Sequence, residues 1–351
     1  MGRDAHRGRE VVARRAADFD ESDVRVRPGK GSRPRSKRRP THDDARAAMV
    51  VSVDRGRWGC VLAGGDDAGV EVVAMRAREL GRTPIVVGDE VGIVGDMSGA
   101  PGSLARIVKV SERSSVLRRT ADDNDPFERI VVANARNLLI VVAAADPPPR
   151  TGFVARALVA AYAGGLQPVL GITKSDLADP EKFAAEFTAL DLPVVTVGVD
   201  DELGDLRDML RGDVSALIGH SGVGKSTLVN RLVPDADRAT SAVSGVGKGR
   251  HTSTKSVALR LPGGGWVIDT PGIRSFGLAH IKPENVLDAF SDLASVAENC
   301  PRGCTHLGPP ADPECAFDEI SDPAVHRRAM AVRELLATLE SNDQWALGPT
   351  E

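Results

Sequence analysis

The chain has 351 residues, 42% hydrophobic and 27% charged, which is enough for two or three globular domains with sizeable cores. Its longest apolar runs, such as residues 137–145, have strand length and fall short of the roughly 18 residues of a membrane span. The N-terminus lacks the apolar core of a signal peptide. Four cysteines, three of them near a histidine, favour a reducing compartment and a metal over disulfides. We therefore expect a cytoplasmic protein without membrane attachment.

The net charge of −4 conceals a basic N-terminal segment. Residues 1–46 hold 14 Lys and Arg against 8 Asp and Glu, a local charge of +6, which leaves −10 for the rest. Within it, KGSRPRSKRRP (30–40) has six basic residues and no hydrophobic one, so it cannot bury enough apolar surface to offset its ordering entropy. We interpret residues 1–46 as a disordered arm, which either follows RNA phosphates or only keeps the protein soluble.

Short β-rich pieces alternate with Gly-rich breaks over residues 47–118. Five short strands in about 70 residues predict a small β-barrel such as an OB-fold. Such barrels often bind oligonucleotides, but Trp58 is the only aromatic residue in this stretch, so base stacking is not evident. The alternative is a structural barrel docked on its neighbour.

From residue 137 onward, apolar strands alternate with helices. The pattern predicts strands and helices in turn at 137–145, 150–165, 167–173, 179–190, 192–199, 203–212, 214–220 and 225–233. Such alternation indicates a parallel sheet with helices on both faces, whose ligands bind at the carboxyl ends of the strands. After residue 280 the chain is polar and helical, with a last helix expected at 323–342.

A phosphate-binding loop follows the strand that begins at residue 214. Its pattern G-x-x-x-x-G-K-[ST] is matched by Gly219, His220, Ser221, Gly222, Val223, Gly224, Lys225 and Ser226. Backbone N–H groups and the helix N-terminus would hold the phosphates. Lys225 would reach the β- and γ-phosphates, Ser226 would coordinate Mg²⁺, and Thr227 would lie near the α-phosphate.

Two further motifs also follow strands. In TKSD (Thr173, Lys174, Ser175, Asp176), the Asp176 carboxylate could accept two hydrogen bonds from guanine, which adenine does not offer, while the Lys174 stem lies along the ring. In WVIDTPG (266–272), Asp269 could hold Mg²⁺ through water, and the Gly272 N–H could contact the γ-phosphate. An ordinary turn is the alternative for TKSD taken alone.

Residues 244–261 lie between the phosphate loop and the last strand, and they are rich in glycine and polar residues. We expect this segment to be mobile until a nucleotide orders it, with Thr252 or Ser253 as a further Mg²⁺ ligand. The motifs together are the guanine-nucleotide set of small GTPases, but the base-recognising motif comes first instead of last. A circular permutation explains this order, because a parallel sheet can be cut and rejoined while its strand ends stay clustered.

The whole arrangement resembles the ribosome small-subunit-dependent GTPase A family, which are circularly permuted bacterial GTPases. The resemblance covers about residues 48–320 and rests on GHSGVGKST, TKSD, GRHTST, DTPG and the late cysteines, in the family's order. It implies an OB-fold and GTP hydrolysis stimulated by the small ribosomal subunit, during late maturation of that subunit in the cytoplasm. Thr173 stands where Asn is usual, so one structural hydrogen bond of the motif depends on a shorter side chain.

The resemblance also implies a zinc site. The family spacing is C-x4-C-x-H-x5-C, whereas Cys300, Cys304, His306 and Cys315 follow C-x3-C-x-H-x8-C. Three thiolates and one imidazole still form a closed, tetrahedral and therefore structural Zn²⁺ site. The alternative is three buried thiols and a surface histidine.

We therefore expect a multidomain protein in four parts: a basic arm (1–46), an OB-fold barrel (47–118), a circularly permuted α/β P-loop GTPase domain (119–280) and a C-terminal helical zinc-binding region (281–351). It would bind GTP or GDP, Mg²⁺ and Zn²⁺, and its partners would be the small ribosomal subunit and its rRNA. We expect the protein itself to be a monomer.

The position that often holds a water-orienting glutamine in small GTPases is Ile273 here, which predicts slow unaided turnover. His251 is the family's candidate for orienting the water, beside Lys225 at the phosphates. A nucleotide-gated RNA-binding module with little catalysis of its own is the alternative function. A P-loop ATPase or kinase would need a different base-recognising residue, so Asp176 predicts that GTP outcompetes ATP.

Overall fold

The computed structural model describes residues 42–119, 129–234, 256–270, 278 and 281–340. Nearly all of the predicted basic arm therefore lies outside the described residues. None of the helices in the described ranges is long and apolar enough to cross a bilayer. The bounds given above for the four parts stay predictions.

The first five strands form a closed barrel, as the sequence predicted. The strand order is β1-β2-β3-β5-β4, and β4 pairs again with β1. Apolar residues alternate with exposed ones, for example along β3, so one face of each strand fills the barrel core. The strands are β1 (Arg46–Asp54), β2 (Arg57–Leu62), β3 (Glu71–Arg76), β4 (Glu90–Gly95) and β5 (Ala105–Val110).

A short antiparallel hairpin, which was not predicted from the sequence, follows the barrel. Its strands are β6 (Val116–Arg119) and β7 (Arg129–Ala133). Leu117 and Val132 pair across the hairpin and are both fully buried. Their burial attaches the hairpin to the same core as the helices described below.

The central domain is built on a parallel sheet with strand order β10-β9-β8-β11-β13, and β12 adds an antiparallel strand beside β13. The circular permutation requires both motifs to lie on one sheet, and they do: β9, which leads into TKSD, and the phosphate-loop strand β11 both pair in parallel with β8. The strands are β8 (Asn137–Ala143), β9 (Gln167–Thr173), β10 (Val194–Val197), β11 (Val214–Gly219), β12 (Val257–Arg260) and β13 (Trp266–Asp269).

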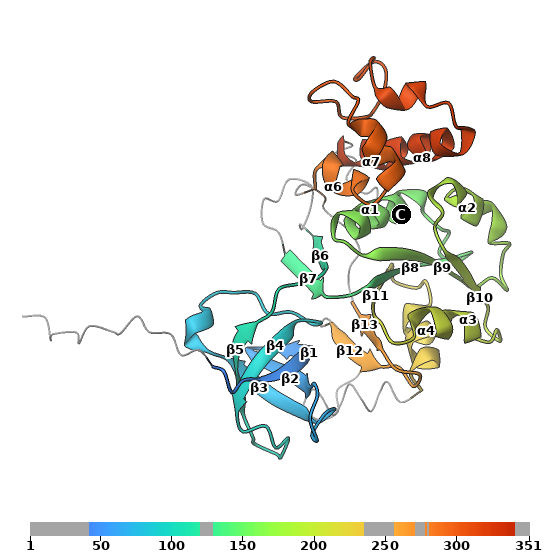
Figure 1. Ribbon diagram of the computed structural model, residues 1–351. Helices are drawn as coiled ribbons and strands as arrows, with labels where there is room; N and C mark the ends of the chain where they lie inside the picture. The colour runs from blue at the N-terminus through green and yellow to red at the C-terminus, as the bar shows by residue number, and fades with distance from the viewer. Residues whose placement is uncertain (1–41, 120–128, 235–255, 271–277, 279–280, 341–351) are drawn as a thin grey trace, which may run out of the picture. The chain divides into compact units, whose positions relative to one another are not determined.

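Helices cover both faces of this sheet (Figure 1). Every residue of β8 is buried: Leu138 and Ile140 pack with α1 and α2, whereas Leu139 and Val141 pack with α3 and α4. A strand buried on both faces favours apolar side chains on both, which is why β8 is apolar from Leu138 to Ala143 with no polar alternation. The helices are α1 (Thr151–Ala163), α2 (Glu181–Ala185), α3 (Gly204–Leu210) and α4 (Lys225–Leu232).

Two sequence-based expectations are wrong in detail. The helix expected at 179–190 is split into α2 and a 3-10 turn at Thr188–Leu190. The segment 244–261, expected to be mobile, ends in strand β12, while residues 244–255 lie outside the described part of the chain. In β12, Ala258 and Leu259 are buried in different cores, and the strand pairs with β13. Burial on both faces and this pairing stabilise a strand here, although the sequence before it is rich in glycine.

The C-terminal region is helical around a compact loop, as predicted. Leu335 and Leu336 of the last helix lie in the same buried core as Leu158 of α1. Its elements are α6 (Pro283–Leu287), α7 (Ser291–Ala297), a 3-10 turn (Ala316–Glu319) and α8 (Pro323–Glu340).

Candidate functional site

The phosphate-type loop connects β11 to α4. Gly224 is the N-cap of α4 and has φ +85°, a left-handed conformation that L side chains rarely adopt. A Cβ on Gly219 would lie 2.5 Å from the Val141 carbonyl oxygen, so the strand β8 leaves no room for a side chain there. The loop therefore has the backbone geometry that lets N–H groups converge at the start of a helix.

Asp269 and Lys225 meet beside this loop. β11 and β13 run parallel, and Asp269 is in register with Leu217, which brings its carboxylate to 3.8 Å from the Lys225 Nζ. Asp269 Oδ1 is buried and accepts no hydrogen bond from the described residues. Burial raises the pKa of Asp269 above its ordinary value, and the nearby Lys225 ammonium offsets only part of this rise. A buried carboxylate oxygen without a donor is suited to a cation or to water bound to one.

Thr173 ties the end of β9 to the phosphate-type loop. Its hydroxyl is 3.0 Å from the Val142 carbonyl oxygen and closer still to that of Val223, to either of which it can donate. The side chain is only 5% exposed, so an unpaired carbonyl there would be costly. The shorter side chain at this position therefore does reach the loop, and the TKSD motif and the loop are in direct contact.

The rest of the TKSD motif turns outward. Lys174 adopts φ +55° and donates from Nζ to the Asp146 carbonyl in the loop after β8. Asp176 is exposed, and its Oδ1 accepts a hydrogen bond of 3.2 Å from the Val199 backbone N–H. Sequence analysis missed this loop after β10, although Gly198 and Val199 stand at the carboxyl end of a parallel strand, where ligand-binding residues are expected.

The structure thus gathers most predicted site residues at the carboxyl edge of the sheet. Ser226 and Thr227, the second and third residues of α4, are exposed there. A cavity of about 260 Å³ adjoins the loop at His220, Ser221 and Val223. Four predicted residues lie outside the described part of the chain: His251, Thr252, its alternative Ser253, and Gly272.

A larger hollow of about 780 Å³ lies at the amino end of β9, around Gln167 and Pro168, and contains none of the predicted site residues. We assign the ligand site to the carboxyl edge despite the smaller volume, because the loops and helix N-termini that bind ligands in open parallel sheets gather there.

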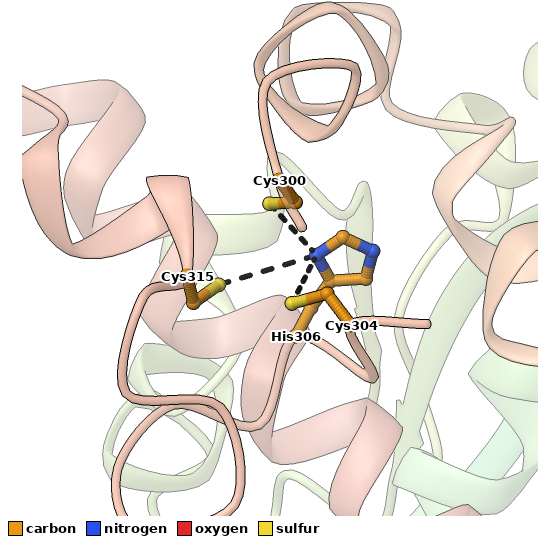
Figure 2. A group of neighbouring side chains, drawn as sticks. All are labelled: Cys300, Cys304, His306 and Cys315. Atoms are coloured by element: carbon orange, nitrogen blue, oxygen red, sulfur yellow. Dashed lines mark hydrogen bonds between the residues drawn. The ribbon is translucent and has the colours of Figure 1, made fainter. Parts of the chain in front are cut away.

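The four predicted zinc ligands converge in the C-terminal region (Figure 2). The Nδ1 atom of His306 lies 3.5, 3.6 and 4.0 Å from the sulfurs of Cys300, Cys304 and Cys315, and all four ligand atoms lie within 4.8 Å of one another. A tetrahedron with Zn–S of about 2.3 Å and Zn–N of about 2.0 Å has S···N edges of about 3.5 Å. The donor set and its spacing therefore fit Zn²⁺.

The long insertion between His306 and Cys315 is part of the scaffold. Asp312 in this insertion accepts hydrogen bonds from the Thr305 N–H and hydroxyl and from the Leu307 N–H, on both sides of the imidazole. The ring also stacks on the buried Phe317 at 5.0 Å between centroids. The eight-residue insertion thus helps to hold His306 in place through Asp312.

Without a metal, the cluster favours neutral groups. Burial raises the pKa of Cys300 and raises that of Cys304 to about 12, and burial lowers the pKa of His306. A metal ion would have to displace the thiol protons on binding, which couples metal affinity to protonation.

The family model of the RsgA GTPase matches residues 110–279. A small ribosomal subunit biogenesis GTPase RsgA from Chlorobaculum parvum is 37% identical over 248 residues, 67% of this chain and 78% of its own. The protein of the same name from Gemmatimonas aurantiaca is 39% identical and covers 68% and 78%. That from Paraburkholderia xenovorans is 32% identical over 318 residues and covers 86% and 95%.

Two solved structures share the architecture. YloQ, described as a circularly permuted GTPase, matches with a TM-score of 0.57 at 20% identity, over 85% of this chain and 97% of its own. YjeQ from Thermotoga maritima matches with a TM-score of 0.56 at 25% identity, over 83% and 98%. The identity to the relatives named above shows the family, and the solved structures agree in fold: the chain belongs to the RsgA GTPase family and is a circularly permuted GTP hydrolase.

Proposed function

We propose that the protein binds the small ribosomal subunit in the cytoplasm and, acting as a monomer, hydrolyses GTP to GDP and phosphate late in subunit maturation. The observation that supports this most is the contact of Thr173 with the phosphate-type loop, which joins the base-recognising and phosphate-binding motifs in one site. The relatives named above, which are called small ribosomal subunit biogenesis GTPases, support the choice of subunit.

Asp176 would recognise the base. Its two carboxylate oxygens can accept from the guanine N1–H and N2 amine, and its exposure leaves room for the base. Lys174 would cover one side of the ring with its methylene stem. Val199, whose N–H fixes one oxygen, would leave the other oxygen and the remaining lone pair for the ligand.

The phosphates would lie along residues 219–227. Lys225 would contact the β- and γ-phosphates, and Gly272 would add a backbone N–H at the γ-phosphate. The buried, donor-free Oδ1 of Asp269 fits Mg²⁺ held through water, with Ser226 and Thr252 as further oxygen ligands. When bound, Mg²⁺ neutralises charge on the phosphate oxygens.

Water attack needs an orienting group, because Ile273, which follows Gly272, has none. His251 would take this role, since an imidazole can orient water and exchange a proton near neutral pH. Contacts with the γ-phosphate would order residues 244–256 and 272–280, and loss of that phosphate would release the subunit. The basic arm and the barrel would bind rRNA.

The first test is GTP turnover with and without small subunits. We expect slow turnover alone, strong stimulation by the subunit, and loss of roughly 10²-fold or more of the stimulated rate in His251→Ala. Unchanged turnover in that variant would exclude His251. Turnover that subunits do not raise would favour the nucleotide-gated RNA-binding module instead.

Replacing Thr173 tests the link between the motifs. Thr173→Val keeps the shape but leaves the Val223 carbonyl without its donor, so we expect GDP affinity to fall about tenfold. Thr173→Ser, which keeps the hydroxyl, should stay near the original affinity. Thr196→Val, at an exposed position on β10, is the matched control. Equal affinity of Thr173→Val and the control in a titration with fluorescent GDP would contradict the link.

Metal analysis tests the cysteine cluster. We expect one Zn²⁺ per chain by elemental analysis, and a melting temperature that falls by several degrees when a chelator removes it, because structural zinc stabilises its fold. Cys304→Ser should lose the zinc, whereas Cys60→Ala, in the barrel core, should keep it. Full zinc content in Cys304→Ser would show that the cluster is not the site.

A further inference from the structure

The loop after β10, residues 198–201, is held by two charged side chains. The Asp201 carboxylate accepts from the Gly198 N–H at 2.5 Å, which closes the loop on itself. The guanidinium of Arg231 donates from Nη1 to the Gly198 carbonyl at 2.8 Å and from Nη2 to the Asp201 carbonyl. Both ends of the loop are therefore fixed by one planar fork.

Arg231 belongs to the helix that begins at the phosphate-type loop. It lies six residues after Lys225 in α4, which corresponds to about 9 Å along the helix axis. Its own carbonyl accepts from Arg207 of α3 at 2.8 Å, so the end of α4 is anchored in turn. One end of α4 thus faces the phosphate side, and the other end holds the loop.

The held loop contacts the base-recognising carboxylate. Val199, between Gly198 and Asp201, donates its N–H to Asp176 Oδ1 at 3.2 Å. Asp176 is exposed. Among the described residues, the Val199 N–H is the only group seen to donate a hydrogen bond to its carboxylate. The loop therefore sets the direction in which the Asp176 carboxylate points.

We propose that Arg231 is a positioning residue for guanine selectivity: it fixes the loop 198–201, whose Val199 N–H orients Asp176 toward the base. This inference rests on the proposed function, because it requires guanine to bind at Asp176. The guanidinium of Arg231 holds two donors in one rigid plane, so it can bond two carbonyls of the loop at once. A lysine ammonium concentrates its donors on a single nitrogen and cannot match both carbonyls in this way. Arg231→Lys should then keep the charge but loosen the loop.

The experiment compares the affinities of GDP and inosine diphosphate, which lacks the 2-amino group. Asp176 can accept the N1–H of both bases but a second hydrogen bond only from the 2-amino group of guanine, so the unaltered protein should prefer GDP by about tenfold or more. Arg231→Lys should lower this preference about fivefold, chiefly by weakening GDP binding. Asp201→Ala removes the acceptor for Gly198 and should act in the same direction, which keeps the test open if one variant fails to fold.

The matched control is Arg211→Lys, since Arg211 pairs with Asp208 on the exposed end of α3 and does not contact the loop. It should retain the original preference. If Arg231 had only a structural role, Arg231→Lys would lower the affinity for both nucleotides equally. A preference that stays within twofold of the original in both Arg231→Lys and Asp201→Ala would therefore overturn the proposal.

A further variant separates this inference from the proposed function. Asp176→Asn should abolish the preference for GDP, because an amide cannot accept both guanine bonds. If Asp176→Asn kept the preference, guanine recognition at Asp176 would be wrong, and the proposed site with it. If Asp176→Asn lost the preference while both loop variants kept it, only the role of Arg231 would be overturned.

Discussion

The nucleotide site depends on the parallel pairing of β8, β9, β10, β11 and β13. Parallel strands in register end at one edge, so the residues that follow them meet there whatever their order in the chain. This is why a permuted sequence can keep its chemistry: Asp269 stands in register with Leu217 of β11, and Val197 of β10 with Thr173 of β9. Covering both faces of the sheet with helices keeps that edge rigid.

Hydrogen bonds between the loops that follow the strands connect the residues at this shared edge. The Thr173 hydroxyl bonds the loop before α4, and the Val199 N–H bonds Asp176. The Arg231 guanidinium then returns from the end of α4 to the loop after β10. The proposed base and phosphate sides of the site are therefore connected both directly and through α4.

Motifs with local geometry could be predicted from the sequence, whereas contacts made over long sequence separations could not. The phosphate-type loop was recognisable because its glycines and its flanking strand and helix all lie between residues 214 and 232. The hydrogen bond from Val199 to Asp176 spans 23 residues and that from Arg231 to Gly198 spans 33. No local sequence pattern predicts either of them. β6 and β7 have only four and five residues, too few for a periodic pattern. The reach of the Thr173 hydroxyl likewise depends on where the fold places the Val223 carbonyl.

The central claim is that residues from three separated motifs surround a single guanine nucleotide. A crystal structure of the protein with GDP and Mg²⁺ tests it most directly. We expect the guanine N1 and N2 atoms to lie within hydrogen-bond distance of the Asp176 carboxylate while the β-phosphate lies against Lys225. A nucleotide whose base lies away from Asp176, with its phosphates still on Lys225, would contradict it.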